Sequence, residues 1–222
     1  MSKFMLNVYA FSRQLSAAGK FLLDAIAPLR CLGCNRIGVM ACEKCLSQVK
    51  IELTSLPGPV PIQANLAVAD FKQPLVQKLI HAFKYDSVYA AGQVLGKWLS
   101  QELNAIIQPD DEILPVPLHS ARKRGRGFNQ SEFLAKILSE KFKVTLNTNL
   151  KRVRNTKPQV ECSGEERKVN LKNAFKFTNK TPARRFVLID DVTTTGSTFL
   201  ECAKAIRKTS SVPILAIAVA RG

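Results

Sequence analysis

Hydrophobic positions in this chain fall into two kinds of pattern, continuous apolar runs and helical repeats. The continuous runs predict buried strands at residues 66–71, 112–118, 185–191 and 213–220. Helical spacing predicts helices at residues 74–85, 88–107, 129–142 and 197–208. Because strands without a polar face alternate with helices, we expect an α/β fold of the Rossmann-like type, with a parallel sheet covered on both faces.

The same pattern divides the chain into four parts. Residues 1–30 read as an amphipathic helical arm, 31–50 as a cysteine-rich finger, and 66–222 as the main domain. Residues 51–65 are expected to be a linker because they hold three prolines and a glycine. No apolar run reaches the roughly 18 residues of a membrane helix, and the start lacks a small-residue cleavage site. We therefore expect no membrane span and a cytoplasmic protein.

Positive charge is concentrated in one part of the chain. The 222 residues carry a formal charge of +16, and residues 151–185 hold 11 basic against 3 acidic side chains. This segment has no dominant period, so we expect a long loop with short strand pieces. Such a cluster favours nucleic acid or a phosphate-rich ligand, and the alternative is a solvated face that aids solubility.

Four of the six cysteines lie within 15 residues, in the sequence CLGCNRIGVMACEKC. Cys31 and Cys34 form one C-x2-C pair, and Cys42 and Cys45 form the other. Two such pairs can hold one tetrahedral ion, so we expect a structural zinc site without an open position. An iron–sulfur cluster or two disulfides are the alternatives.

The strand predicted at 185–191 ends in two adjacent acids, Asp190 and Asp191, which we call the acid pair. The hydroxyl loop, residues 193–198, follows it. Gly196 allows a positive φ, so successive backbone N–H groups can form a nest for an anion. Ser197 or Thr198 is expected to cap the next helix, whose start also favours an anion. Carboxylates beside a phosphate nest suit a ribose 5-phosphate.

The sequence FVLIDDVTTTGST (186–198) resembles the phosphoribosyl pyrophosphate (PRPP) motif of type I phosphoribosyltransferases. The resemblance implies that the acid pair holds the ribose 2′- and 3′-hydroxyls and that the loop cradles the 5′-phosphate. It also implies Mg²⁺ bound with PRPP. The PRPP-binding residues expected in addition to the acid pair are Thr193, Thr194, Thr195, Gly196, Ser197 and Thr198.

Further segments in the same order resemble the ComF family of competence-associated proteins (ComFC- and GntX-like). They are LIHAFKY, PVPLHSARKRGRGFNQSEFLA, RVRNTKPQ and ERKVNLKNAF, and with the cysteine finger the likeness spans residues 22–222. The family implies single-stranded DNA as a partner, together with a ComFA-like helicase and a DprA-like recombination mediator.

The resemblance also gives the basic loops a place. The loop in PVPLHSARKRGRGFNQ and the loop that begins with RVRNTKPQ would bind the pyrophosphate or DNA, and the second of them would close over PRPP. Their expected contributors are Arg122, Arg124, Arg126, Arg154, Thr156 and Gln159. Arg152 and Lys157 would act in catalysis with Asp190 and Asp191, either of which could instead serve as a base.

A pocket for a nucleobase is not recognisable in the sequence. Three interpretations therefore stay open: a DNA-handling protein of natural transformation with a PRPP-type site, a metabolic phosphoribosyltransferase acting on a base or amine, and a scaffold whose site has lost catalysis. Whether catalysis is retained and which acceptor is used do not follow from the residues.

Overall fold

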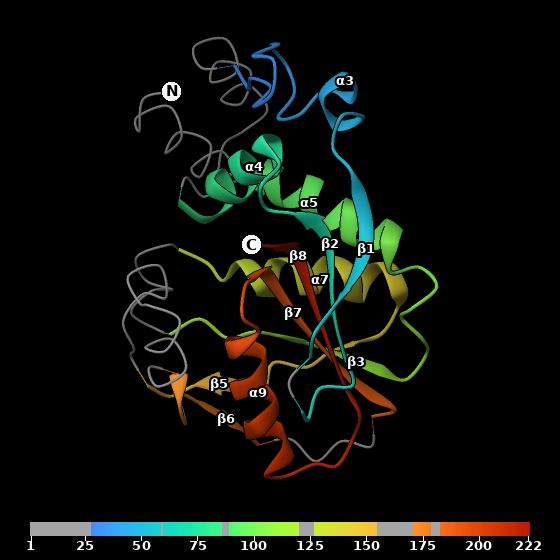
Figure 1. The fold of residues 1–222 in the computed structure, drawn as a ribbon, viewed down its shortest axis with the longest axis vertical. Coiled ribbons are helices and arrows are strands. Elements are labelled where there is room, and N and C mark those ends of the chain that lie inside the picture. The colour runs from blue at the N-terminus through green and yellow to red at the C-terminus, as the bar shows by residue number, and fades with distance from the viewer. Residues whose placement is uncertain (1–27, 59, 86–88, 120–126, 155–170, 179–182) are drawn as a thin grey trace, which may run out of the picture.

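The computed structural model describes residues 28–58, 60–85, 89–119, 127–154, 171–178 and 183–222. Figure 1 shows the arrangement of the elements. In chain order these are α3 (Glu43–Leu46), β1 (Ile51–Leu56), β2 (Ala64–Asp70), α4 (Pro74–Tyr85), α5 (Tyr89–Glu102), β3 (Asp111–Pro115), α7 (Gln130–Phe142), β4 (Thr145–Leu146), β5 (Leu150–Arg152), β6 (Phe175–Phe177), β7 (Arg185–Thr193), α9 (Ser197–Arg207) and β8 (Ile214–Arg221).

The main sheet has six strands in the order β1-β2-β8-β7-β3-β4. All neighbouring pairs are parallel except β1 and β2, which are antiparallel. The expected α/β class with a mostly parallel sheet is confirmed. In such sheets ligands bind beyond the carboxyl ends of the strands, so a ligand site is expected at the end of the central strand β7.

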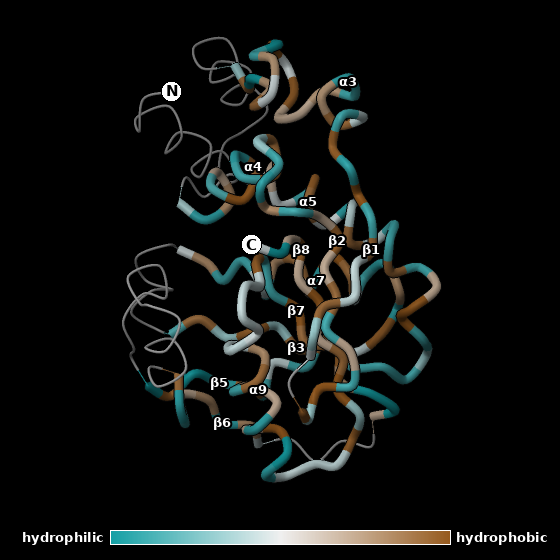
Figure 2. Tube along the Cα trace, in the orientation of Figure 1, coloured by the Kyte–Doolittle hydropathy of each residue, from teal (hydrophilic) through white to brown (hydrophobic). Residues whose placement is uncertain are grey.

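The two faces of the sheet are covered by different elements. Along β7, Val187 and Ile189 belong to the core formed with α4, α5 and α7. Phe186 and Leu188 belong to a second core, which contains residues of α9 and β6. Hydrophobic residues gather along these central strands (Figure 2). Because successive side chains of a strand point to opposite faces, the all-apolar sequence of β7 follows from burial on both sides.

The structure places an edge strand in the first part of the segment expected to be a linker. β1 pairs with β2, with Ile51 opposite Ala69. The prolines that predict a break begin at Pro57, after the strand ends, so they terminate β1 without interrupting it. The finger is therefore followed directly by a strand of the main sheet.

Four further features bear on the predictions. The helix expected at 88–107 ends at Glu102. The strand pieces expected in the basic segment are β5 and β6, which pair antiparallel. Most of the predicted N-terminal arm, residues 1–27, lies outside the described residues. Within the described ranges, none of the helices has the length and apolarity needed to cross a bilayer.

Candidate functional site

The hydroxyl loop leads from β7 into α9 through a left-handed residue. Gly196 has φ 70° and is the N-cap of α9, and as a glycine it has no side chain to cap this helix end. The expectation that Ser197 or Thr198 caps the helix is therefore wrong. Ser197 is already the first helical residue, its hydroxyl hydrogen-bonds to the Thr195 hydroxyl, and its N–H lies 3.4 Å from that same oxygen. Glycine is favoured here because its φ is positive.

A small cavity of about 200 Å³ lies at this strand end. One member of the acid pair, the whole hydroxyl loop and a lysine from α4 line it together. The lining residues are Lys84, Asp190, Val192, Thr193, Thr194, Thr195, Gly196, Ser197, Thr198 and Phe199. Of the residues that the sequence grouped by spacing, all except Asp191 thus surround one space, next to the start of a helix, where backbone N–H groups and the helix dipole favour an anion.

The two acids have different partners. Lys84 Nζ lies 2.8 Å from Asp191 Oδ1, and both side chains are largely shielded from solvent. Ser131 Oγ donates to Asp190 Oδ1 over 2.8 Å, and the Asp191 N–H donates to the same oxygen over 2.9 Å. Asp191 is therefore held by a cation, whereas Asp190 is held by neutral donors.

The surroundings of Asp190 also shift the pKa of its carboxyl group. Burial, and then the negative charge of Asp191, raise the pKa of Asp190 to about 7, against the opposing effects of the Ser131 hydrogen bond and the Lys84 charge. A carboxyl group that titrates near neutral pH at the mouth of a polar cavity is typical of functional sites. Asp190 can hold or release a proton at physiological pH.

Ser131 was not singled out as a site residue by the pattern, although the segment that carries it was, whereas Lys84 was expected to border the site. Ser131 stands in the first turn of α7 because Asn129 caps that helix, accepting from the Ser131 N–H over 3.2 Å. The Asn129 side chain also donates to Val116 O over 3.1 Å, which ties the helix start to the chain beyond β3. An N-cap signal, Asn two residues before Ser, marks this helix start in the sequence.

The structure places only some of the predicted basic residues. Arg152 lies on β5, with its guanidinium 5.5 Å from the centre of the Phe175 ring, and it lines a hollow separate from the cavity of the hydroxyl loop. Arg154 donates to Lys172 O. The other predicted contributors lie outside the described residues: Arg122, Arg124, Arg126, Thr156, Lys157 and Gln159.

The four finger cysteines come together as one cluster, which we call the cysteine cluster. Their Sγ atoms all lie within 4.8 Å of one another. The Cys31 and Cys42 sulfurs are 3.7 Å apart, and the Cys34 and Cys42 sulfurs are 3.6 Å apart. Disulfide sulfurs would be about 2.05 Å apart, whereas four thiolates around a tetrahedral Zn²⁺ are about 3.8 Å apart. The donor set and spacing fit a single tetrahedral ion such as zinc.

The first knuckle is built so that the sulfurs can approach. The Cys31 N–H donates to Arg36 O over 2.7 Å and closes the turn. A Cβ at Gly33 would lie 2.6 Å from Cys45 Sγ, so no larger residue fits without displacing a ligand. Although burial opposes it, hydrogen bonds from backbone N–H groups, that of Cys34 first, lower the pKa of Cys31 to about 6. Cys31 is thus prepared as a thiolate, the form that binds metal.

No protein-family model matches the chain. Among solved structures, adenine phosphoribosyltransferase from Saccharomyces cerevisiae is 18% identical, with a TM-score of 0.32 over 77% of this chain and 83% of that one. Orotate phosphoribosyltransferase from Mycobacterium tuberculosis is 14% identical, with a TM-score of 0.33 over 74% of this chain and 75% of that one. Because both TM-scores are below 0.5, membership of a family has to rest on the sequence relatives.

The sequence relatives share more identical residues with this chain than the solved structures do. DNA utilization protein YhgH of Escherichia coli K12 is 33% identical over 181 residues, covering 79% of this chain and 75% of the relative. Competence protein F of Haemophilus influenzae is 37% identical over 140 residues, covering 59% of this chain and 61% of that protein. Competence protein ComFC of Streptococcus pneumoniae is 23% identical over 83% of its length. The chain belongs to the ComF/YhgH family of competence and DNA-utilization proteins.

Proposed function

We propose that this protein handles DNA during uptake or use of external DNA, binds single-stranded DNA, and carries a binding site for PRPP. The printed names of its relatives, competence protein and DNA utilization protein, support the DNA role. So does the formal charge of +16, because positive charge is the sequence-independent source of affinity for phosphate backbones. A ComFA-like helicase and a DprA-like recombination mediator would be its partners in this process.

The observation that carries the PRPP proposal is the convergence of Asp190, Lys84 and the hydroxyl loop around one cavity, with Asp191 held beside it by Lys84. In this proposal the carboxylates accept from the ribose 2′- and 3′-hydroxyls. The 5′-phosphate lies in the loop, where Gly196 turns the backbone and the start of α9, whose N-cap is this glycine, faces it. The hydroxyls of Thr194, Thr195 and Thr198 would add donors.

Lys84 and Ser131 would prepare the acid pair for the sugar. Lys84 pairs with Asp191 over 2.8 Å and offsets its charge, which holds this carboxylate in place to accept from a hydroxyl. Ser131 fixes one oxygen of Asp190, which leaves the other oxygen as the second acceptor. Such fixed side chains lower the cost of ordering the site when the ligand binds.

Carboxylate oxygens suit Mg²⁺, and a Mg²⁺ ion brought with PRPP would neutralise the pyrophosphate as it leaves. Of the residues proposed for that half of the reaction, Arg152 and Arg154 lie within the described ranges and the others lie outside them. Transfer of the ribose 5-phosphate to a base or amine is the alternative function. The retained acid pair favours it as well, since the same residues would hold PRPP in either case.

The proposal is tested by thermal unfolding with ribose 5-phosphate, ribose or phosphate added singly. We expect ribose 5-phosphate to raise the midpoint more than either fragment, because it alone engages the acid pair and the loop together. The effect should vanish in Asp190→Ala/Asp191→Ala and persist in Glu140→Gln, an exposed carboxylate on α7. Equal shifts from phosphate alone would reduce the site to an anion nest and refute the PRPP assignment.

The DNA role has its own test, the fluorescence anisotropy of a labelled thymidine oligonucleotide at several salt concentrations. We expect affinity to fall steeply with salt, as ion release from the phosphate backbone requires. Binding that does not change with salt would contradict the electrostatic role of the basic surface.

A further inference from the structure

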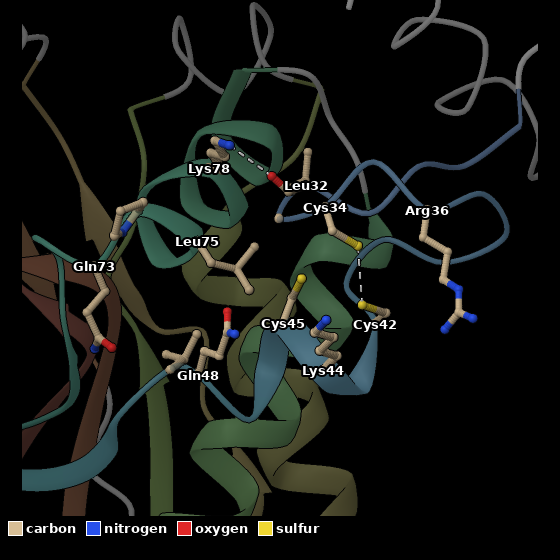
Figure 3. Close-up of a pocket in the computed structure, with 13 residues that line it drawn as sticks. Leu32, Cys34, Arg36, Cys42, Lys44, Cys45, Gln48, Gln73, Leu75 and Lys78 are labelled. Carbon is tan, nitrogen blue, oxygen red and sulfur yellow. Dashed lines mark hydrogen bonds between the residues drawn. The ribbon is translucent and has the colours of Figure 1, made fainter.

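A second and larger hollow lies between the finger and the start of α4, far along the chain from the acid pair. It has a volume of about 740 Å³, within the range of ligand sites in proteins. Figure 3 shows the side chains around it, with Leu75 and the sulfur of Cys45 facing the same space. The residues that define this cluster hollow are Leu32, Gly33, Cys34, Arg36, Cys42, Lys44, Cys45, Gln48, Val49, Gln73, Pro74, Leu75 and Lys78.

The lining combines an apolar floor with a cationic rim. Leu32, Val49, Pro74 and Leu75 supply aliphatic surface, and none of the lining residues is acidic. Of the three cations, Lys78 donates to Leu32 O over 3.0 Å, so it fastens the finger to α4. Arg36 and Lys44 are exposed. The rim therefore offers two exposed positive charges, which stand beside an aliphatic floor without acidic residues.

This combination selects a ligand with a flat apolar part between phosphates. We infer that the cluster hollow holds an unpaired nucleotide of single-stranded DNA, with the base on the apolar floor and the flanking phosphates at Arg36 and Lys44. In a duplex the base faces are stacked on one another and cannot reach such a floor. The inference rests on the proposed DNA role and gives it a place on the molecule.

The two cations have another possible role, which the test must separate. Four thiolates around one Zn²⁺ carry a net charge of −2, and nearby cations offset it. If Arg36 and Lys44 served only the cysteine cluster, their removal would release zinc and leave DNA affinity unchanged in the molecules that keep the metal. Neither residue is itself a ligand in the cluster.

The experiment compares Arg36→Gln/Lys44→Gln with a variant of equal charge, Lys136→Gln/Lys141→Gln on α7. Anisotropy of a labelled thymidine oligonucleotide is measured against salt, and zinc is measured by atomic emission. Loss of two phosphate contacts should reduce the slope of log affinity against log salt by about 1.4, while the control keeps the wild-type slope. Both variants should keep one zinc per chain. On the wild type, an abasic strand of equal length should bind more weakly than the thymidine strand.

Four results would overturn the inference. If the slope of log affinity against log salt is the same for the two variants, while the wild type binds the oligonucleotide, DNA does not bind in the cluster hollow. The proposed DNA role would still stand. Loss of zinc in Arg36→Gln/Lys44→Gln without loss of affinity would assign the cations to the cluster. A polyglutamate chain that binds as tightly as the oligonucleotide, with the same loss in the variant, would make the occupant an acidic protein segment. Wild-type protein that binds no oligonucleotide would refute both the inference and the DNA role.

Discussion

Replacing Asp190 by asparagine is expected to stabilise the protein, although Asp190 stands at the centre of the candidate site. Its carboxyl group is surrounded by buried atoms and by the charge of Asp191, so ionising it costs free energy in the folded state. An asparagine oxygen can still accept from Ser131 and from the Asp191 N–H. The substitution therefore removes the cost and keeps the hydrogen bonds.

The size and sign of the effect follow from the pKa. In the folded protein the pKa of Asp190 is about 7, raised from an ordinary value of 3.8. Between these values the native state holds a proton that the unfolded chain has lost, so the stability of the wild type falls as pH rises. Each pH unit is worth about 1.36 kcal/mol, which gives about 4 kcal/mol over the whole interval and about 2 kcal/mol between pH 5.5 and pH 7. Above pH 7 the difference stays constant.

Urea denaturation of wild type and Asp190→Asn at pH 5.5 and pH 8 measures this difference. We expect Asp190→Asn to be the more stable protein at pH 8, and its advantage to be about 2 kcal/mol smaller at pH 5.5. Titration of the cysteine cluster affects both proteins equally and cancels. An exposed control, Glu140→Gln, should show no such dependence. An advantage that is absent at pH 8, or equal at both pH values, would refute this account of the acid pair.

Three further substitutions test other parts of the structure. Lys84→Met removes the cation of the acid pair and should lower the free energy of unfolding by about 3 kcal/mol at pH 8, and by less at pH 5.5. Lys84→Arg keeps a cation and should retain most of the stability. A loss that urea denaturation finds to be the same at both pH values would contradict this. Cys31→Ser should release the zinc, as atomic emission would show, and full retention would argue against four thiolate ligands. Gly92→Ala places a Cβ 2.5 Å from the Phe83 ring and should cost about 1–3 kcal/mol of unfolding free energy, unlike Gly58→Ala, whose Cβ would meet nothing closer than 3.7 Å.

The parts of the fold that follow from sequence are those buried on both faces. The run from Phe186 to Ile189 has no polar position, so it predicts a central strand. α4 is equally clear, because Pro74 starts it and its apolar positions recur at helical spacing. β1 was missed because it is an edge strand without a fully buried position, so its hydrophobic pattern is weak and the prolines beyond it dominate the signal.

The site shows the same limit. The acid pair and hydroxyl loop are contiguous, so their spacing alone predicts that they meet. Ser131 lies 59 residues from Asp190 in the chain, and only the packing of α7 against the sheet brings its hydroxyl to the carboxylate. Lys84 reaches Asp191 in the same way, from the end of α4. Contacts of this kind depend on tertiary packing, which local patterns do not encode.

The central claim is that the acid pair binds PRPP in a protein that handles DNA. Calorimetric titration with PRPP and Mg²⁺ tests it most directly, on wild type and on Asp190→Ala/Asp191→Ala, with and without a thymidine oligonucleotide. The account predicts PRPP binding that disappears in the double variant, and an affinity for PRPP that changes when DNA is bound, because two ligands of one mechanism should be coupled. Binding that survives loss of both carboxylates, or a wild type that binds DNA but no PRPP, would contradict it.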